Sequence, residues 1–311
     1  MTVRHPIASR RRARLGLSLS LILVVAAIVA ACAGGAESPP SSESRLTVVA
    51  TTTVFADIVH NVGGDRVSVG SIIPAGVGPE DYEPKPDDAK QLAGADLIVS
   101  NGVGLDDFLD KLLQASGEEQ ATRLVLGDGI PTIGVDGEPN PHFWLDPSLV
   151  AAHYVPAIAA ALSRLDPAGA QTYAADAASY TTQLEALDAA NKAAFARIPA
   201  ANRKLVTFHD AFPYFAAHYG FELIGVILPN VGQEPSASQL AELVAKVKAA
   251  HVKAVFSEAQ FNAKLAHTLA EEAGITNVVT TLYNDTVGPP PSDTYLKMMA
   301  WNADQIVQSL K

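Results

Sequence analysis

The stretch PAGAQTYAADAASYTTQLEALDAANKAAFARIP, residues 167–199, separates two series of alternating strand-like and helix-like segments. Within it, similar positions recur at spacings of three and four, at Tyr173, Ala177, Tyr180, Leu184, Leu187, Asn191 and Ala194. This spacing indicates one face of a helix that Pro167 and Pro199 bound. Some 30 residues of helix extend roughly 45 Å. Two interpretations stay open, a domain's buried helix and a single rigid connector between two lobes.

The segments on either side of this stretch alternate between β-branched apolar runs and helical patterns. The expected strands are 46–53, 67–73, 95–100 and 123–126 before it, and 205–208, 222–228, 254–257 and 277–282 after it. Such alternation predicts parallel sheets covered by helices. We therefore expect an α/β fold with two lobes, each with a mostly parallel sheet flanked by helices. The lobes would span residues 46–166 and 199–311, with the linking helix at 167–198.

The first 45 residues have the features of an export signal and a tether. Five arginines precede an apolar run over residues 15–31, which ends in small residues and Cys32. This order predicts a signal peptide at 1–31, although its length also fits a retained membrane helix. The tetrad Val-Ala-Ala-Cys at 29–32 resembles a bacterial lipobox, so Cys32 would be lipidated and followed by a flexible tether to residue 45. Export by the general or the twin-arginine route stays open.

Composition narrows the function classes. Of the 311 residues, 48% are hydrophobic and 18% charged, which excludes a disordered chain. The net charge of −11 argues against a nucleic-acid partner, which needs a basic surface. Cys32 is the only cysteine, so neither a disulfide within the chain nor a thiolate metal site is possible. His-Glu-x-x-His and Gly-x-Ser-x-Gly motifs are absent from the sequence, which argues against the alternative of a metal-dependent hydrolase.

Three residues stand where ligands bind in open α/β folds, beyond the carboxyl ends of strands, and a fourth stands before a helix start. His209 ends a predicted strand, while Glu80 and Asp285 follow predicted strands in loops. His142 lies in Asn-Pro-His-Phe-Trp-Leu-Asp-Pro, just before a predicted helix start. Spacing along the chain does not by itself bring these four together.

Several segments in order resemble the zinc/manganese ABC-transporter substrate-binding lipoproteins. They are PEDYEPKPDDAKQLAGADLIVSNGVGLDDFLDKLL, NPHFWLDP, TFHDAFPYFAAHYG, GQEPSASQL, FSEAQFNAKLAHTLAEEAG and LYNDTVG, the last followed by YLKMMAWNADQIVQSL. The resemblance covers residue 46 to the C-terminus. It implies that Glu80, His142, His209 and Asp285 bind the metal ion. Glu80 departs from the family pattern, which has histidine there, so Asp81 and a site of only three protein ligands stay open as rivals.

The resemblance also implies the function. The chain would be the extracytoplasmic, lipid-anchored component of an ABC transporter on the outer face of the cytoplasmic membrane. It would be a monomer, not an enzyme, that captures Zn²⁺ or Mn²⁺ between its lobes and delivers it to a membrane permease. A surface adhesin is a further alternative.

Neighbouring residues and the metal type follow from the same resemblance. Asp146, Asp210 and Glu258 are candidates to orient the ligands, with helix capping the simpler role for Asp146. Two carboxylates among the ligands favour Mn²⁺ more than an all-histidine site would, although Zn²⁺ would still bind well. The loop 127–141 contains no histidine, which disfavours a dedicated zinc scavenger.

Overall fold

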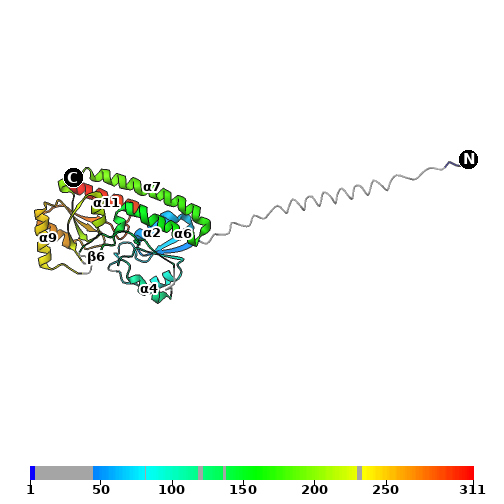
Figure 1. Ribbon diagram of the computed structural model, residues 1–311, viewed down its shortest axis with the longest axis horizontal. Helices are drawn as coiled ribbons and strands as arrows, with labels where there is room; N and C mark the ends of the chain where they lie inside the picture. Colours follow the sequence, from blue (N-terminus) through cyan, green and yellow to red (C-terminus); the bar gives the residue numbers. More distant parts are fainter. Residues whose placement is uncertain (4–44, 81, 118–121, 136–137, 230–232) are drawn as a thin grey trace. The chain divides into compact units, whose positions relative to one another are not determined.

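A computed structural model describes residues 1–3, 45–80, 82–117, 122–135, 138–229 and 233–311. Arg45–Lys311 forms one compact unit (Figure 1). The predicted signal peptide, Cys32 and most of the predicted tether lie outside the described residues.

The first half of the compact unit is built on a four-stranded parallel sheet in the order β2-β1-β3-β4. Its strands are β1 (Leu46–Ala50), β2 (Val67–Ser71), β3 (Leu97–Ser100) and β4 (Arg123–Val125). Its helices are α2 (Thr53–Gly63), α3 (Pro86–Ala93) and α4 (Phe108–Ser116). A short hairpin follows, formed by β5 (Gly134–Val135) and β6 (Glu138–Pro139). The sequence pattern did not indicate this hairpin or helix α3.

The second half contains two pairs of parallel strands. One pair is β7 (Lys204–His209) with β8 (Glu222–Leu228), and the other is β9 (Val255–Glu258) with β10 (Val278–Leu282). Strand β7 also lies beside β9. The helices here are α8 (Pro213–Tyr219), α9 (Ala237–Ala249), α10 (Lys264–Ala273) and α11 (Tyr295–Leu310). Parallel strands flanked by helices in both halves confirm the predicted α/β class.

Helix α7 (Ala170–Phe195) is the long helix that the sequence predicts, with 26 residues. It is shorter than expected at both ends, because a 3₁₀ turn occupies Pro167–Gly169 and the helix ends at Phe195. In Figure 1 it runs alongside α11, and it contacts α2 and α6 as well. It therefore packs against helices of both halves. The domain boundaries at 166/167 and 198/199 stay a prediction.

The helical run Pro147–Leu165 precedes α7 and begins at an Asp146 cap, whose carboxylate accepts a hydrogen bond from the Ser148 amide. It comprises α5 (Pro147–Leu149), a π-helical turn and α6 (Val155–Leu165). Of the described residues, only this run is long and apolar enough to span a membrane by length and composition. Here it packs into the core against α2 and α7.

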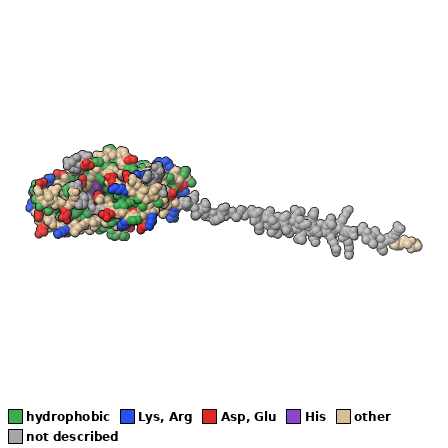
Figure 2. Space-filling view, turned by 90° about the horizontal axis from the view of Figure 1, so that it is seen from below, with side chains coloured by type: hydrophobic (Ala, Val, Ile, Leu, Met, Phe, Trp, Pro, Cys, Tyr) green, Lys and Arg blue, Asp and Glu red, His purple; other side chains and the backbone are tan. Residues whose placement is uncertain are grey.

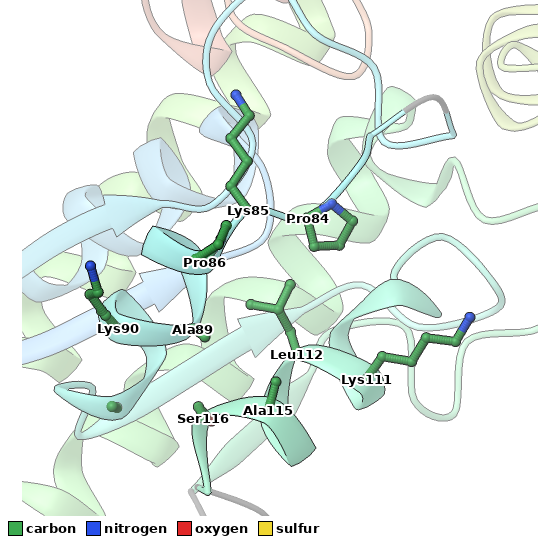
Figure 3. Close-up of a pocket in the computed structure, with 10 residues that line it drawn as sticks. Pro84, Lys85, Pro86, Ala89, Lys90, Lys111, Leu112, Ala115 and Ser116 are labelled. Carbon is green, nitrogen blue, oxygen red and sulfur yellow. The ribbon is translucent and has the colours of Figure 1, made fainter.

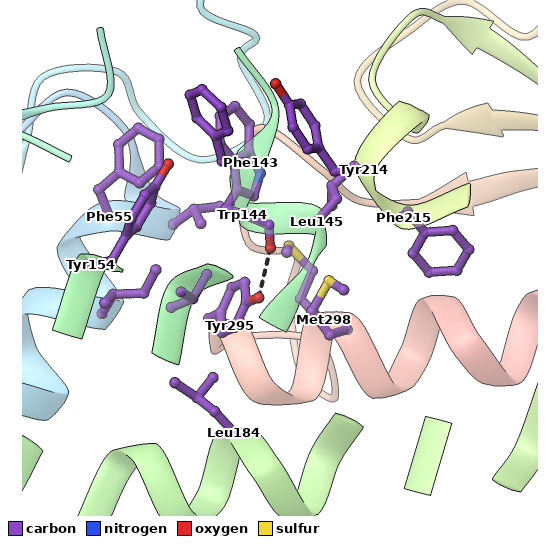
Figure 4. Packing of buried hydrophobic residues seen from close by; sticks show 14 of the residues in the cluster. Phe55, Phe143, Trp144, Leu145, Tyr154, Leu184, Tyr214, Phe215, Tyr295 and Met298 are labelled. Atoms are coloured by element: carbon purple, nitrogen blue, oxygen red, sulfur yellow. Dashed lines mark hydrogen bonds between the residues drawn. The ribbon is translucent and has the colours of Figure 1, made fainter. Parts of the chain in front are cut away.

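One large apolar cluster joins the two halves (Figure 4). The ring of Trp144 stands edge-on to Phe55 of α2, with centroids 5.1 Å apart. The hydroxyl of Tyr295, at the start of α11, donates to the Trp144 carbonyl at 2.6 Å. Truncating an aromatic side chain buried in this way to alanine costs about 3–5 kcal/mol of stability. The core thus fixes the backbone that immediately follows His142.

Candidate metal centre

Four predicted ligands converge in the interior of the compact unit. One ligand atom from each of Glu80, His142, His209 and Asp285 lies within 4.8 Å of the others. The Nε2 atom of His142 is 3.6 Å from Glu80 Oε1 and 3.4 Å from Asp285 Oδ1. The Nε2 atom of His209 is 3.9 Å from Glu80 Oε1 and 3.6 Å from Asp285 Oδ2. We call these four residues the four-residue cluster.

Parallel strands bring the candidate ligands of the second half together. His209 is the last residue of β7 and Glu258 the last residue of β9, so both stand at the carboxyl edge of neighbouring strands. Asp285 follows β10, which pairs with β9. From the first half, Glu80 lies in the loop after β2 and His142 directly precedes a 3₁₀ turn at Phe143–Leu145. The strand-end placement expected from sequence describes the arrangement well.

Hydrogen bonds determine which nitrogen of His142 faces the other ligands. Asn140 donates through Nδ2 to the Asp210 carbonyl at 2.5 Å, which leaves its Oδ1 as an acceptor. The backbone amide and Nδ1 of His142 both lie 3.0 Å from that oxygen. Because Oδ1 can only accept, Nδ1 carries the proton toward Asn140. In the neutral imidazole, Nε2 then presents a lone pair to the centre of the cluster.

Glu258 faces the other ring nitrogen of His209 as a charged neighbour, without a hydrogen bond between them. Glu258 Oε1 lies 3.3 Å from His209 Nδ1, and both side chains are almost fully buried. A carboxylate behind an imidazole fixes the ring's tautomer and raises its basicity as a ligand. Glu258, a candidate from the sequence, therefore lies on the side of His209 away from the cluster's centre.

The electrostatics of the cluster fit a missing positive charge. Burial would lower the pKa of His209, but Glu258, Asp285 and Glu80 raise it to about 10. Burial likewise opposes the rise in the pKa of His142, which Asp285 and Glu80 produce. Burial would raise the pKa of Glu80, yet contact with His142 and the charge of His209 lower it to about 2. Without a cation, a proton on His209 offsets part of the carboxylate charge.

Buried polar atoms at the centre lack hydrogen-bond partners. Among the described residues, His142 Nε2 and Asp285 Oδ1 are such atoms, although their side chains are 5% and 0% exposed. Glu80 is the most accessible member, with 24% of its side chain exposed. Buried groups are normally paired, and an unpaired one needs an explanation such as an ion. Two imidazole nitrogens and two carboxylates are a donor set that Zn²⁺ and Mn²⁺ accept.

Two amide side chains that the sequence pattern did not reveal hold Asp285. Gln260 donates through Nε2 to Asp285 Oδ2 at 2.9 Å and to Asn284 Oδ1 at 3.0 Å. Asn284 Oδ1 also accepts the Asp285 amide at 2.7 Å, and the Asn284 carbonyl accepts the Trp144 indole N–H at 2.7 Å. Asparagine and glutamine are common in loops, so their presence alone does not indicate a role at a site. The one sequence signal that could have pointed to Asn140 and Asn284 is their closeness in sequence to a candidate ligand.

The remaining candidates from the sequence lie elsewhere. Asp146 faces His218, with Oδ2 3.2 Å from Nδ1, and does not reach a ligand imidazole. Asp210 acts on Asn140, through its carbonyl and through Oδ2 at 3.3 Å. Asp81, the rival of Glu80, and Cys32 lie outside the described residues.

A pocket of about 690 Å³ lies apart from this cluster, between α3 and α4 (Figure 3). Proline, alanine and leucine side chains line it together with Lys85, Lys90 and Lys111, and none of the four ligands does. Figure 2 shows acidic and basic side chains interspersed over the visible face of the compact unit. That face carries no broad basic surface of the kind that binds nucleic acid.

Comparison with known proteins shows the family. The family model described as "Zinc-uptake complex component A periplasmic" matches residues 48–309, and the chain belongs to this family. The manganese-binding lipoprotein MntA of Halalkalibacterium halodurans is 33% identical over 268 residues, which cover 85% of this chain and 88% of that protein. This result confirms the resemblance noted in the sequence.

Two solved structures share the fold. The Mn-bound periplasmic metal-binding protein of Candidatus Liberibacter asiaticus is 27% identical with a TM-score of 0.78, over 86% of this chain and all of that one. The periplasmic zinc-binding protein TroA of Treponema pallidum is 29% identical with a TM-score of 0.78, over 86% and 99% of the two chains. Members of the family thus include manganese-binding and zinc-binding proteins.

Proposed function

We propose that this chain is the extracytoplasmic substrate-binding component of an ABC transporter for Zn²⁺ or Mn²⁺. It captures one ion on Glu80, His142, His209 and Asp285 and delivers it to a membrane permease. The observation that carries the proposal is a cluster of two imidazoles and two carboxylates, three of its four residues buried, in which His142 Nε2 and Asp285 Oδ1 lack hydrogen-bond partners. A divalent cation would satisfy those atoms and replace the imidazole protons.

The donor set favours binding over catalysis. Four protein ligands fill a tetrahedral shell, as in closed zinc sites, whereas catalytic zinc keeps a position open for water. Enclosure of the cluster further limits access of a second substrate. The ion is therefore the cargo, and the protein is not an enzyme.

The donor set also bears on which metal is carried. Glu80 supplies an anionic oxygen where the family pattern has an imidazole, and the two carboxylates give the four ligands a charge of about −2. Oxygen ligands suit Mn²⁺ better than an all-nitrogen shell does, while the general affinity order still favours Zn²⁺. We propose Mn²⁺ as a cargo in addition to Zn²⁺.

The rest of the proposal concerns placement in the cell. Lipidation of Cys32 would hold a monomer beside its permease on the outer face of the cytoplasmic membrane. Residues 46–166 and 199–311 would act as two lobes joined by the helix within 167–198. The relatives' descriptions as lipoproteins support this placement.

Metal loading tests the proposal. Protein stripped with a chelator and dialysed against Mn²⁺ or Zn²⁺ should retain about one ion per chain by elemental analysis. Asp285→Asn should lose most of that ion, because its carboxylate is central and fully buried. Asp293→Asn, which changes an exposed carboxylate paired with Lys297, should load like the natural chain. Equal loading of both variants would contradict the assignment.

A further inference from the structure

We infer that the hydroxyls of Thr53 and Thr286 form a latch that positions the Glu80 loop over the bound ion and slows release of the ion. The inference rests on the proposed function and extends it to the control of release. Thr286 directly follows Asp285, while Thr53 is the first residue of α2 in the other half. The latch is the Thr53–Thr286 pair together with the backbone groups that it contacts.

The two hydroxyls join three segments that meet at the cluster. Thr53 Oγ1 and Thr286 Oγ1 are 3.1 Å apart. Thr286 Oγ1 accepts a hydrogen bond from the Gly76 amide at 3.0 Å, and Gly76 belongs to the loop that leads to Glu80. Thr53 Oγ1 accepts a hydrogen bond from the Val287 amide at 3.1 Å. The segment that carries Asp285 is therefore tied both to α2 and to the Glu80 loop.

The Glu80 loop depends on such a tie more than the other ligands do. His142 and His209 are held by Asn140 and Glu258, and Asp285 by Gln260, whereas Glu80 is the most exposed of the four side chains. Gly78 lies between the two sides, since a Cβ there would stand 3.3 Å from Glu80 Oε2 and 3.9 Å from Asp285 Oδ2. The loop thus packs closely against the Asp285 side.

Loss of the Thr286 hydroxyl would act on Glu80 first. Thr286 is 2% exposed but Gly76 is exposed, so with valine there the Gly76 amide would exchange its tie to the Asp285 side for water. The loop would then leave the ion more often and take Glu80 with it. A ligand that detaches more often speeds dissociation, while encounter of the ion with the open site changes little.

Release of Mn²⁺ into excess chelator, followed by stopped flow, tests the latch. Thr286→Val should speed release roughly threefold to tenfold, the range for the net loss of one hydrogen bond. Thr286→Ser, which keeps the hydroxyl, should stay within about twofold of the natural rate. Thr182→Val is the matched control, because that hydroxyl is exposed and bonds within its own helix. Thr53→Val provides a second route to the same effect if Thr286→Val does not fold.

A double-mutant cycle with Glu80→Gln distinguishes an effect of the latch on Glu80 from a general loosening of the protein around the ion. If the latch acts through Glu80, Thr286→Val should add less than about twofold to the release rate in the Glu80→Gln background. An equal acceleration in both backgrounds, or none in the natural background, would overturn the latch while the proposed function stands. A natural chain that loads no Mn²⁺ and no Zn²⁺ would overturn the proposed function and the latch with it.

Discussion

Within the described part of the chain, two clusters combine histidine with carboxylates, and they differ in how completely their polar atoms are paired. In the His218 cluster, which consists of Asp146, Asp188 and His218, each imidazole nitrogen faces one carboxylate, at 3.2 and 2.7 Å. The outer oxygens are also used, by Ser148 on Asp146 and by Lys192 on Asp188. In the four-residue cluster, His142 Nε2 and Asp285 Oδ1 have no hydrogen-bond partner.

The difference separates a structural ion pair from the proposed ligand site. The His218 cluster links the segment after His142, helix α7 and helix α8, so its role is to hold three elements together. The four-residue cluster brings one atom from each residue within 4.8 Å of the others, and His142 Nε2 and Asp285 Oδ1 keep no hydrogen-bond partner. Unusual titration behaviour alone does not distinguish such clusters, because structural networks also shift pKa values. The two kinds of cluster are distinguished by where the polar atoms point and by whether those atoms have hydrogen-bond partners.

The largest expected contrast is between His209→Ala and His218→Ala. Removal of His209 deletes a ligand, and the Kd for Zn²⁺ should rise at least about 100-fold. Removal of His218 should change the Kd by less than about threefold, yet lower the free energy of unfolding by about 1–3 kcal/mol, because two carboxylates lose a partner. Chelator competition and thermal unfolding measure the two effects. A similar loss of affinity in both variants would contradict the distinction between a structural cluster and a ligand cluster.

Acidity should affect metal binding at the four-residue cluster strongly. Nearby carboxylates raise the pKa of His142, and they raise that of His209 to about 10, so the His209 imidazole holds a proton near pH 7 without metal. The ion must displace that proton, so affinity should fall as pH falls, roughly tenfold per pH unit for each proton displaced. Calorimetry in buffers of different ionisation enthalpy counts the protons released. Proton-independent binding between pH 6 and 8 would contradict this account.

Glu258→Gln should have an intermediate effect. The substitution keeps the shape but removes the charge behind His209, and loss of such a partner weakens metal binding about tenfold or more. Asp210→Asn is the matched comparison, because the backbone carbonyl of Asp210 makes the shorter contact with Asn140 and survives the change. We expect less than a threefold change there. If Asp210→Asn weakens metal binding as much as Glu258→Gln does, then the orientation of His142 affects the affinity as much as the charge near His209.

The smallest effect concerns selectivity. Glu80→His replaces a hard anionic oxygen with a neutral nitrogen and should move the ratio of Mn²⁺ to Zn²⁺ affinity several-fold toward Zn²⁺. Glu83→His, at an exposed position three residues further on, should leave the ratio unchanged. Metal competition followed by elemental analysis gives both ratios. An unchanged ratio in Glu80→His would mean that Glu80 is not a ligand or that geometry sets the selectivity.

Much of the fold follows from local patterns in the sequence. Strand β8 begins and ends at the predicted residues, and the other paired strands of the two halves lie within a few residues of expectation. Apolar strands between helical patterns have few other ways to bury both faces. The hairpin at Gly134–Pro139 was missed because its strands are two residues long. The start of α11 beside Trp144 is a tertiary contact that periodicity does not encode.

The candidate site likewise has residues that the sequence could predict and residues that it could not. Strand ends pointed to His209 and to the loops of Glu80 and Asp285, but only family resemblance joined them, since 62 to 76 residues separate successive members of the four. Asn140 and Gln260 could not be predicted, because their roles depend on which neighbour each amide meets after folding. Glu258 was a candidate from its strand end, and its position behind His209 depends on β9 lying beside β7.

Crystals of the metal-loaded protein, measured at the Mn and Zn absorption edges, test the central claim most directly. We predict one anomalous peak per chain, with Glu80, His142, His209 and Asp285 each supplying an atom at about 2.0–2.2 Å. The peak should be absent from His209→Ala crystals and present in those of His218→Ala. A peak at the His218 cluster, or a peak that neither His142 nor His209 contacts, would contradict the claim.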